Sequence, residues 1–462
     1  MVMSQAAVVK MVRDTLYPQF KRQKDSLDAI DNALRGVEPD HNLIPARATL
    51  EHRALRDLTH TPLLQIVVTT VAQTLFADGY KSPDSGEDAR GWDTWQANDF
   101  DRRQSQIHRA ALSYGLAFAT VLPGVDANGP RSVMRGVSPR RMVALYQDSA
   151  EDDWPMYAMR VEASGDKLMC RVYDEKAVYF VSMGAGGDDI QFIEWREHGA
   201  GVCPVVRYTN LLDLDGRADG EVAPLIPIAS RHRKTVYDRM LAQHFNSWKV
   251  RTATGLERPE DDAEAQAEKL RLQQEDILVS DSVDTKFGTL DETPLKPFLD
   301  AMQSDLDELS AVAQVPSTAL SGTVANLSAD AIAELRAGLT QKTAERKMSF
   351  GSSHAQAIRL ALQLEGDQSA AADYTARMTW QDMSPRTMAQ TVNALSVAAE
   401  KLQIPPQKLW HMIPGLTKSD VDEWIDDAAK ATRRAALQER LATAATTAAV
   451  QNSTVAGLSQ QR

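Results

Sequence analysis

The stretch over residues 298–366 constrains the fold of this chain more than any other. Its pattern predicts a helix over 298–314, an uncharged loop over 317–328 (STALSGTVANLS), and then a very long helix. The long helix begins at Ser328, a residue type that caps helix N-termini, and ends before Gly366, which suits the position after a helix. About 38 residues make a rod of roughly 57 Å, much longer than an average globular helix. We therefore expect a structural element with neighbours rather than an enzyme pocket.

Length and composition exclude several classes of protein. A chain of 462 residues is long enough for two to four domains. Its net charge of −12 argues against a protein that coats nucleic acid, because such proteins are basic, but it allows one past which DNA slides. The two cysteines have no metal-ligand spacing, which fits a reducing compartment. Because we find no signal segment and no apolar run of about 20 residues, we expect a soluble, non-secreted protein.

The first half of the chain predicts helices followed by a sheet. Amphipathic or apolar helices are expected over 1–35, 46–58 and 62–77. From Ser132 to Asn210 the apolar period changes to two, with several turn sequences between the alternating runs. This pattern predicts an antiparallel meander, and its place between helical blocks gives an α+β fold class.

A tryptophan-containing block precedes the meander. Trp92 and Trp95 lie three residues apart on one helical face, and we favour core packing over a ligand cage for them. The apolar residues that follow recur at steps of four and three and predict a buried helical seam that ends at Pro123-Gly124: Ile107, Ala111, Tyr114, Phe118 and Val121.

An acidic loop follows the meander. It contains two glycines and four carboxylates, Asp213, Asp215, Asp219 and Glu221. The spacing partly matches a calcium-binding loop but lacks its regular ligand positions. A solvent-exposed linker is therefore the favoured interpretation, and whether a divalent ion binds there stays open.

A basic helix and an acidic insertion come next. The helix is expected over 228–252, and its two histidines, His232 and His244, lack partner ligands nearby. Residues 259–297 are acidic and predict a short helix start, a strand at 276–280 and a strand towards Phe287 that breaks at Gly288. The acidic run is either a solvated face or a docking surface for a basic partner.

The C-terminal part is predicted to be mostly helical. We expect an irregular segment over 378–383, and a disordered tail from about residue 452. Helices are expected over 386–401, 405–412 and 419–447.

The sequence contains no recognisable catalytic motif. We find no phosphate-binding GxxxxGK[ST], no HExxH, no GxSxG and no dinucleotide-binding glycine pattern, and the histidines are scattered. The chain is therefore not expected to be an enzyme, and no cofactor, catalytic residue or metal site is predicted.

Four segments in a fixed order resemble one protein family. They are TPLLQIVVTTVAQTLFADGY (61–80), WDTWQANDFDRRQSQIHRAALSYGLAFATVLPG (92–124), PLIPIASRHRKTVYDRML (224–241) and VPSTALSGTVANLSADAIAELRAGLTQKTAERKMSFG (315–351). Together they resemble portal proteins, the head-to-tail connectors of long-tailed (siphovirus-type) bacteriophages, as found in phages of actinobacteria. No single segment is as specific as a catalytic motif, but the four span nearly the whole chain.

The resemblance implies a portal fold that assembles as a dodecameric ring with wing, stem, clip and crown. The implied divisions are the wing (1–225), first stem helix (226–258), clip (259–297), second stem helix (298–314), channel or tunnel loop (315–328), long wing/channel helix and return (329–378), and crown with a flexible C-terminal tail (379–462).

The resemblance also implies a function and partners. The ring would lie at one capsid vertex of the virion, after assembly in the host cytoplasm, and would pass double-stranded DNA during packaging and ejection. Implied partners are the terminase large subunit, the head–tail adaptor, and the major capsid and scaffolding proteins, with no membrane. The implied DNA-channel residues are Ser321, Gly322, Thr323, Val324 and Asn326, and the implied motor- and adaptor-docking residues of the clip are Glu260, Asp261, Asp262 and Glu264.

Simple electrostatics agrees with this interpretation. A ring with net negative charge repels the phosphate backbone, and an uncharged loop can touch DNA without capturing it. Two alternatives remain: a ring-forming structural adaptor that does not take part in DNA passage, and a DNA-processing enzyme with an unfamiliar site. Negative-stain images distinguish the ring from the enzyme.

Overall fold

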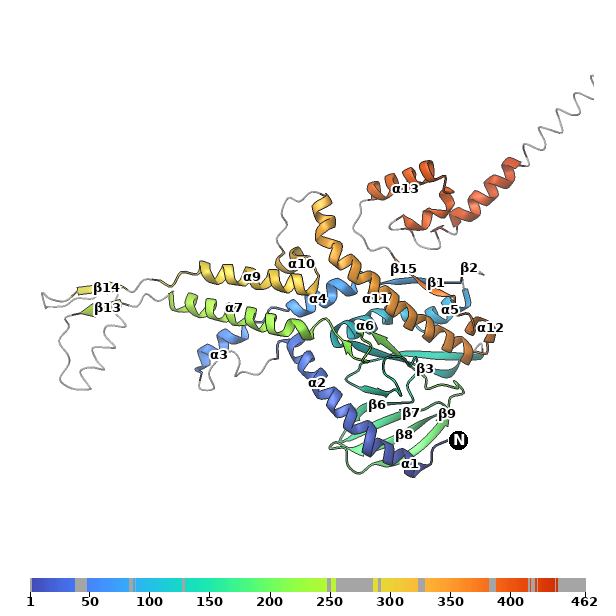
Figure 1. Ribbon diagram of the computed structural model, residues 1–462, viewed down its shortest axis with the longest axis horizontal. Helices are drawn as coiled ribbons and strands as arrows, with labels where there is room; N and C mark the ends of the chain where they lie inside the picture. Colours follow the sequence, from blue (N-terminus) through green and yellow to red (C-terminus); the bar gives the residue numbers. More distant parts are fainter. Residues whose placement is uncertain are drawn as a thin grey trace, which may run out of the picture. The chain divides into compact units, whose positions relative to one another are not determined.

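The fold is α+β, as expected, and the chain forms two compact units, Met1–Gln381 and Asp382–Arg462. Figure 1 shows the computed structural model. The residues that it describes are 2–37, 48–82, 86–87, 89–126, 129–246, 251–254, 286–289, 292–322, 329–381, 388–413, 416, 420–421, 423–436 and 438.

Helices dominate the first part of unit 1. They are α1 (Gln5–Met11), a π-helical turn (Val12–Leu16), α2 (Tyr17–Arg35), α3 (Leu50–Asp57), α4 (Leu63–Ala72), α5 (Ala89–Ala97) and α6 (Phe100–Tyr114). The side chain of Ser4 accepts a hydrogen bond from the N–H of Ala7 and caps α1. The three early helices predicted from the sequence are thus present, although α3 begins later and α4 ends earlier than expected.

The predicted antiparallel meander is confirmed. Five strands pair in chain order: β5 (Met142–Leu145), β6 (Tyr157–Ser164), β7 (Lys167–Tyr173), β8 (Ala177–Gly184) and β9 (Gln191–Glu197). The helices α1 and α2 lie across this sheet (Figure 1) and bury one of its faces. The core between them includes Val8, Leu16, Val161, Val172 and Tyr179.

The remaining strands of unit 1 form smaller sheets. The sheet β10-β3-β4 joins Val205–Thr209, Leu116–Asp126 and Gly129–Val137, and β15-β1-β2 joins Arg377–Trp380, Ala77–Ser82 and Gly86–Glu87. Two ribbons complete the set: β11 (Leu211–Leu212) with β12 (Ala218–Asp219), and β13 (Arg251–Thr254) with β14 (Lys286–Thr289).

Long helices complete unit 1. After a 3-10 turn (Ala223–Leu225) come α7 (Ile226–Asn246), α9 (Lys296–Ala313), α10 (Ser317–Ser321), α11 (Ala329–Leu364) and α12 (Gln368–Ala371). Figure 1 shows α7 and α9 side by side, and Arg231 joins them by bonding Asp305 and Glu308, each at 2.6 Å. The expected long helix is therefore present with 36 residues, and Gly366, at φ +89°, follows its end as predicted.

Unit 2 is helical in the residues described. It contains α13 (Met388–Leu402) and two 3-10 turns, Pro406–Lys408 and Trp410–Met412. The described residues between 420 and 438 are also helical, and the rings of Trp410 and Trp424 meet edge to face at 5.9 Å. The prediction of a helix over 386–401 is confirmed within a few residues, whereas 405–412 forms only short turns.

The predicted seam that runs to Pro123 is wrong beyond Tyr114. The helix α6 ends there because Gly115 takes a left-handed conformation at φ +91°, and a Cβ at this position would lie 2.1 Å from the carbonyl oxygen of Ala218. Phe118 and Val121 belong to strand β3, where residues three apart point to opposite faces. They accordingly lie in two different cores.

Three further boundaries differ from the predictions. The expected irregular segment 378–383 begins in a strand, because Arg377–Trp380 pairs with β1, and its last two residues lie outside the described range. The helix expected over 228–252 ends at Asn246, and Arg251–Thr254 is a strand. Gly288 lies within β14 rather than breaking it, and the strand predicted at 276–280 lies outside the described residues.

The main core of unit 1 packs α4, α6 and the second half of α11 against the small sheets. Its members include Val67, Ile107, Val121, Tyr208 and Ile358. Trp95 is fully buried here and its ring stacks on that of Trp92 at 5.7 Å, which confirms core packing.

Two buried histidines form a hydrogen-bonded chain within this core. The Nδ1 of His108 lies 3.2 Å from the carbonyl oxygen of Leu75, its Nε2 lies 2.8 Å from Nε2 of His354, and Nδ1 of His354 lies 2.9 Å from the hydroxyl of Tyr208. A carbonyl only accepts, so His108 donates to it, His354 donates to His108, and Tyr208 donates to His354. These directions hold when both imidazoles are neutral, and each ring nitrogen then has a partner of the right kind. Burial lowers the pKa of His108 to about 3 and, together with its neighbour, lowers the pKa of His354 well below its ordinary value.

We expect the free energy of unfolding to fall as the pH drops below about 6.5, the ordinary histidine pKa. The unfolded chain then binds protons that the folded chain excludes, so stability is full above that pH and is lost progressively towards pH 3. The loss for His108 is about 1.4 kcal/mol per pH unit within this window. Urea unfolding at pH 7.5, 6.5, 5.5 and 4.5 measures it.

The control is Tyr208→Phe, which removes a hydrogen bond without removing a titrating histidine. It should lower stability by about 1 kcal/mol at each pH and leave the slope unchanged. A flat stability profile between pH 7.5 and 4.5 in the unsubstituted protein would contradict the neutral pair.

Candidate functional site

The segment between α9 and α11 is only partly a loop. Gln314 ends α9 in a left-handed conformation, Val315 and Pro316 are buried, and α10 occupies Ser317–Ser321. The first residues of the predicted 317–328 loop are therefore helical, which corrects that prediction. We call residues 314–322 the loop base.

The predicted channel residues fall on both sides of the described range. Ser321 is the last residue of α10, and Gly322 is exposed and follows it with φ +66°. Thr323, Val324 and Asn326 lie outside the described residues. The predicted N-cap, Ser328, also lies outside them.

The loop base is anchored to the core from α9. The hydroxyl of Ser310 donates a 2.6 Å hydrogen bond to the carbonyl of Val315, whose side chain joins the main core. Gly338 of α11 faces Gln314, but a Cβ there would make only ordinary contact at 3.5 Å. Gly338 and Gly351 both lie inside α11.

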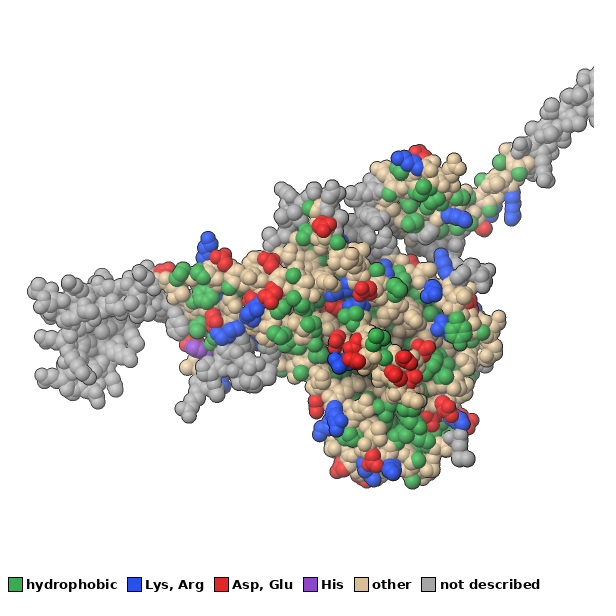
Figure 2. All heavy atoms as spheres, viewed as in Figure 1, with side chains coloured by type: hydrophobic (Ala, Val, Ile, Leu, Met, Phe, Trp, Pro, Cys, Tyr) green, Lys and Arg blue, Asp and Glu red, His purple; other side chains and the backbone are tan. Residues whose placement is uncertain are grey.

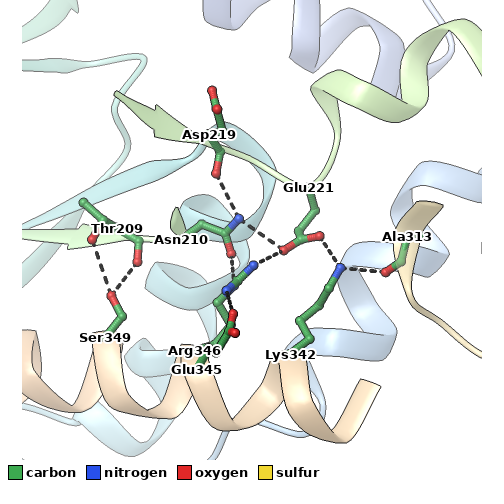
Figure 3. Close-up of polar contacts among 9 residues, drawn as sticks. All are labelled: Thr209, Asn210, Asp219, Glu221, Ala313, Lys342, Glu345, Arg346 and Ser349. Atoms are coloured by element: carbon green, nitrogen blue, oxygen red, sulfur yellow. Dashed lines mark hydrogen bonds and ion pairs between the residues drawn. The ribbon is translucent and has the colours of Figure 1, made fainter. Parts of the chain in front are cut away.

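A buried ionic cluster lies next to the loop base, and Figure 3 shows its members converging from three elements. We define the ionic cluster as Glu221, Asn210, Lys342 and Arg346. Lys342 donates to one oxygen of Glu221 at 2.5 Å, and Arg346 donates to the other at 2.9 Å. The amide of Asn210 donates to Glu221 at 3.1 Å and accepts a hydrogen bond from Nε of Arg346.

The cluster also reaches α9 directly. The ammonium of Lys342 donates a second hydrogen bond, of 2.6 Å, to the carbonyl of Ala313, the last residue of α9. Helix-terminal carbonyls lack partners within the helix, so this bond satisfies one of them. One lysine therefore connects α9, α11 and the segment between the β11–β12 hairpin and the 3-10 turn Ala223–Leu225.

The charges in the cluster are nearly inaccessible to water. The side chains of Lys342, Arg346 and Glu221 are 5%, 3% and 8% exposed. Two cations surround one buried carboxylate, and Glu345, 69% exposed, supplies a second carboxylate to Arg346 at 3.2 Å. Burial alone raises the pKa of Glu221, but Lys342 and Arg346 outweigh it and hold that pKa below the ordinary value.

The acidic segment before α7 therefore has two parts. Asp213 and Asp215 are exposed in the β11–β12 hairpin, where Asp213 accepts hydrogen bonds from the N–H groups of Asp215 and Arg217. The prediction of an exposed linker is correct for them but wrong for Glu221, which is buried and paired with two cations. Among the described residues, no group of three His, Cys, Asp or Glu side chains is placed to hold a metal ion.

The sequence did contain one unused signal for this cluster. Leu339, Lys342, Arg346 and Phe350 recur at steps of three and four on the buried stripe of α11. Two cations on a core-facing stripe require a buried anion, since an unpaired buried charge is very costly. The signal predicts that a partner exists but does not identify Glu221.

The structure describes both histidines of α7 but not the predicted clip residues. His232 is buried on α7, and Nε2 of His244 contacts Glu51 at 2.7 Å. Glu260, Asp261, Asp262 and Glu264 lie outside the described residues, between strands β13 and β14. Figure 2 shows Lys and Arg interspersed with Asp and Glu over α7 and α9, so this face carries no field of a single sign.

Membrane insertion through a helix has no support in the part of the chain that is described. None of its helices combines the length and the apolar character that a bilayer crossing requires.

We expect Glu221→Gln to lower the free energy of unfolding by about 3–5 kcal/mol, because it leaves two buried cations without their carboxylate. The matched control is Glu345→Gln, one residue before Arg346 on the exposed side of α11, which should change stability by no more than about 0.5 kcal/mol. Urea unfolding of the three proteins at pH 7.5 measures both effects. Equal losses in the two variants would contradict the special role of the buried carboxylate.

Comparison with known proteins finds one family and related portal proteins. The family model described as phage portal protein, SPP1 Gp6-like, matches residues 13–436. A portal protein of Mycobacterium phage D29 is 24% identical over 403 residues, which cover 83% of this chain and 81% of that protein. A portal protein of Mycobacterium phage L5 is 24% identical over 359 residues, covering 73% and 72%. Because this match covers residues 13–436, the chain belongs to the phage portal protein family of the SPP1 Gp6-like type.

Proposed function

We propose that this chain forms a dodecameric ring at one vertex of a phage capsid and that the ring is the conduit for double-stranded DNA during packaging and ejection. The observation that carries the proposal is the family match, which extends over residues 13–436 of 462. A match of that extent includes all the elements on which a ring-shaped conduit would depend, and it is not confined to one shared motif.

The division of the ring into regions is part of the proposal. We assign 1–225 to the wing, which contains the meander and its covering helices. We assign 226–258 and 298–314 to the stem, and the bounds of α7 and α9 support this, because they fall almost entirely within these ranges. The clip would be 259–297, which includes β14, and β13 pairs with that strand from the end of the 226–258 range. The crown and tail would be 379–462, and the second compact unit begins at Asp382.

We further propose that 315–328 is the channel loop. Its two ends continue into α9 and α11, which the ionic cluster and the main core hold in place. The segment has no charged residue, so its contact with a phosphate backbone would be weak. A moving DNA duplex requires weak contacts, because every strong one would have to be broken at each step. Residues 329–378, the long helix and its return, would then lead the chain from the loop back into the wing.

The role that we propose is structural rather than enzymatic. Portal proteins are structural components, and ATP hydrolysis would belong to the terminase large subunit, which docks on the clip. The head–tail adaptor would later take the same place, and the major capsid and scaffolding proteins would surround the wing. The protein would assemble in the host cytoplasm and remain in the virion. The alternative is a ring-forming adaptor that takes no part in DNA passage.

Ring formation is the first expectation to test. Negative-stain electron microscopy of the purified full-length protein should give rings with twelve-fold symmetry and a central channel. Co-purification with capsid protein would give the same particle at a vertex. A monomer that forms no ring and does not associate with capsids would contradict the proposal.

Two variants separate DNA passage from a purely adaptor role. Deletion of Ser321–Asn326 should leave rings and heads intact but lower the amount of packaged DNA, measured as nuclease-resistant DNA per head. Reversal of charge at Glu260, Asp261 and Asp262 should instead weaken binding of the terminase large subunit, measured by pull-down with wild-type rings as the control. Normal packaging by the deletion variant would favour the adaptor alternative, and unchanged terminase binding would remove the docking assignment.

A further inference from the structure

Lys342 is the point where α11 enters the core. Glu334, Arg336 and Ala337, towards the N-terminal end of the helix, are exposed. Leu339 is the first buried side chain after them, and Lys342 and Thr343 follow one turn later. Residues 334–337 of α11 are therefore solvated, and Lys342 is the first charged side chain after them that is buried among polar partners.

Lys342 bonds two groups that lie far apart in the sequence. Its ammonium donates to the carboxylate of Glu221 and to the carbonyl of Ala313, which directly precedes the loop base. Glu221 follows the β11–β12 hairpin, and its backbone N–H donates to the carbonyl of Leu112 on α6. The carboxylate is thus fixed to the core, and it can orient the ammonium towards Ala313.

We infer that Lys342 is a positioning residue that seats the loop base, residues 314–322, and that Glu221 acts through it. The inference rests on the proposed function only in calling 315–328 the channel loop; the seating itself is a property of the chain. Lysine suits this place because its compact ammonium has three donors and can serve two acceptors on different elements.

Arg346 provides a control inside the same cluster. It lies one turn further along α11 and bonds Glu221, Asn210 and Glu345. None of these bonds reaches Ala313 or the loop base. If the cluster only stabilises the fold, losing either cation should loosen the same parts of the chain. If Lys342 positions the loop base, removing Lys342 should loosen the loop base, whereas removing Arg346 should not.

The readout is amide hydrogen exchange of the full-length protein, followed at protected amides of the loop base. Suitable amides are those of Val315, Ala319 and Gly322, which donate to Ser310, Pro316 and Thr318. Lys342→Met keeps the length of the side chain but removes its donors, and should speed exchange at these amides by about tenfold or more, the expected loss of one charge-assisted bond. Lys342→Arg keeps the charge and should restore most of the protection.

Arg346→Met should act elsewhere. It should speed exchange around Asn210 and Glu221 while the amides of the loop base stay within about twofold of the wild-type rate. Equal acceleration of the loop base by the Lys342→Met and Arg346→Met variants would overturn the inference. So would an unchanged loop base in Lys342→Met.

A double variant keeps the test valid if Lys342→Met alone does not fold. Glu221→Gln with Lys342→Met removes one of the two cations together with the carboxylate, so it leaves fewer unpaired buried charges than Glu221→Gln alone. Only Arg346 then lacks the carboxylate, and it keeps its bonds to Asn210 and Glu345. This variant still leaves the Ala313 carbonyl without its donor. The double variant should therefore fold and yet exchange rapidly at Val315, Ala319 and Gly322. Wild-type protection in this folded protein would overturn the inference.

The exchange result is independent of DNA, so it separates the seating from the proposed function. Rapid exchange at the loop base together with normal DNA packaging by the double variant would confirm the seating and contradict the channel-loop assignment. Rapid exchange with reduced packaging would support both.

Discussion

The fold of unit 1 depends on a carboxylate placed between two cations away from water. Taking three charges out of solvent is costly, and the cost is offset only when every partner is present with good geometry. Glu221 meets this condition because Asn210, Lys342 and Arg346 occupy all sides of it. The consequence is that three elements from distant parts of the chain have one acceptable arrangement, and a small displacement of any one would leave a buried charge unpaired.

Local sequence patterns predicted helices and strands well where the spacing of apolar residues fits only one of the two. Alternating runs within 132–210 predicted the meander, which occupies 142–197, and a capping residue and a following glycine predicted the long helix, which ends at Leu364. The error at Phe118 and Val121 has a physical cause. Spacings of three and four fit a helix, but they also fit a strand whose two faces are both buried, and β3 lies between two cores. Gly115 marks the point where the helix gives way to the strand. A glycine is required there because any Cβ would collide with Ala218, about a hundred residues away in the sequence.

The candidate site was predictable only in outline. The position of the loop between two helices follows from Pro316 and the polar composition of 317–328, but α10 inside it does not. The ionic cluster joins residues more than a hundred positions apart, so no window of the sequence contains it. The cation pair on α11 indicated that an anion was needed, whereas the choice of Glu221 among several nearby carboxylates required the three-dimensional arrangement.

The pairing of β1 with β15 has a consequence for how the chain reaches this structure. Strand Ala77–Ser82 bonds to Arg377–Trp380 in antiparallel register, with Tyr80 opposite Met378, and Gln381 donates to Phe76. During synthesis the first strand leaves the ribosome long before its partner exists, and pairings of such large sequence separation form slowly. Unit 1 therefore cannot complete this sheet until about four-fifths of the polypeptide has been made. A nascent or truncated chain exposes an unpaired strand edge and is not yet a folded subunit that can assemble.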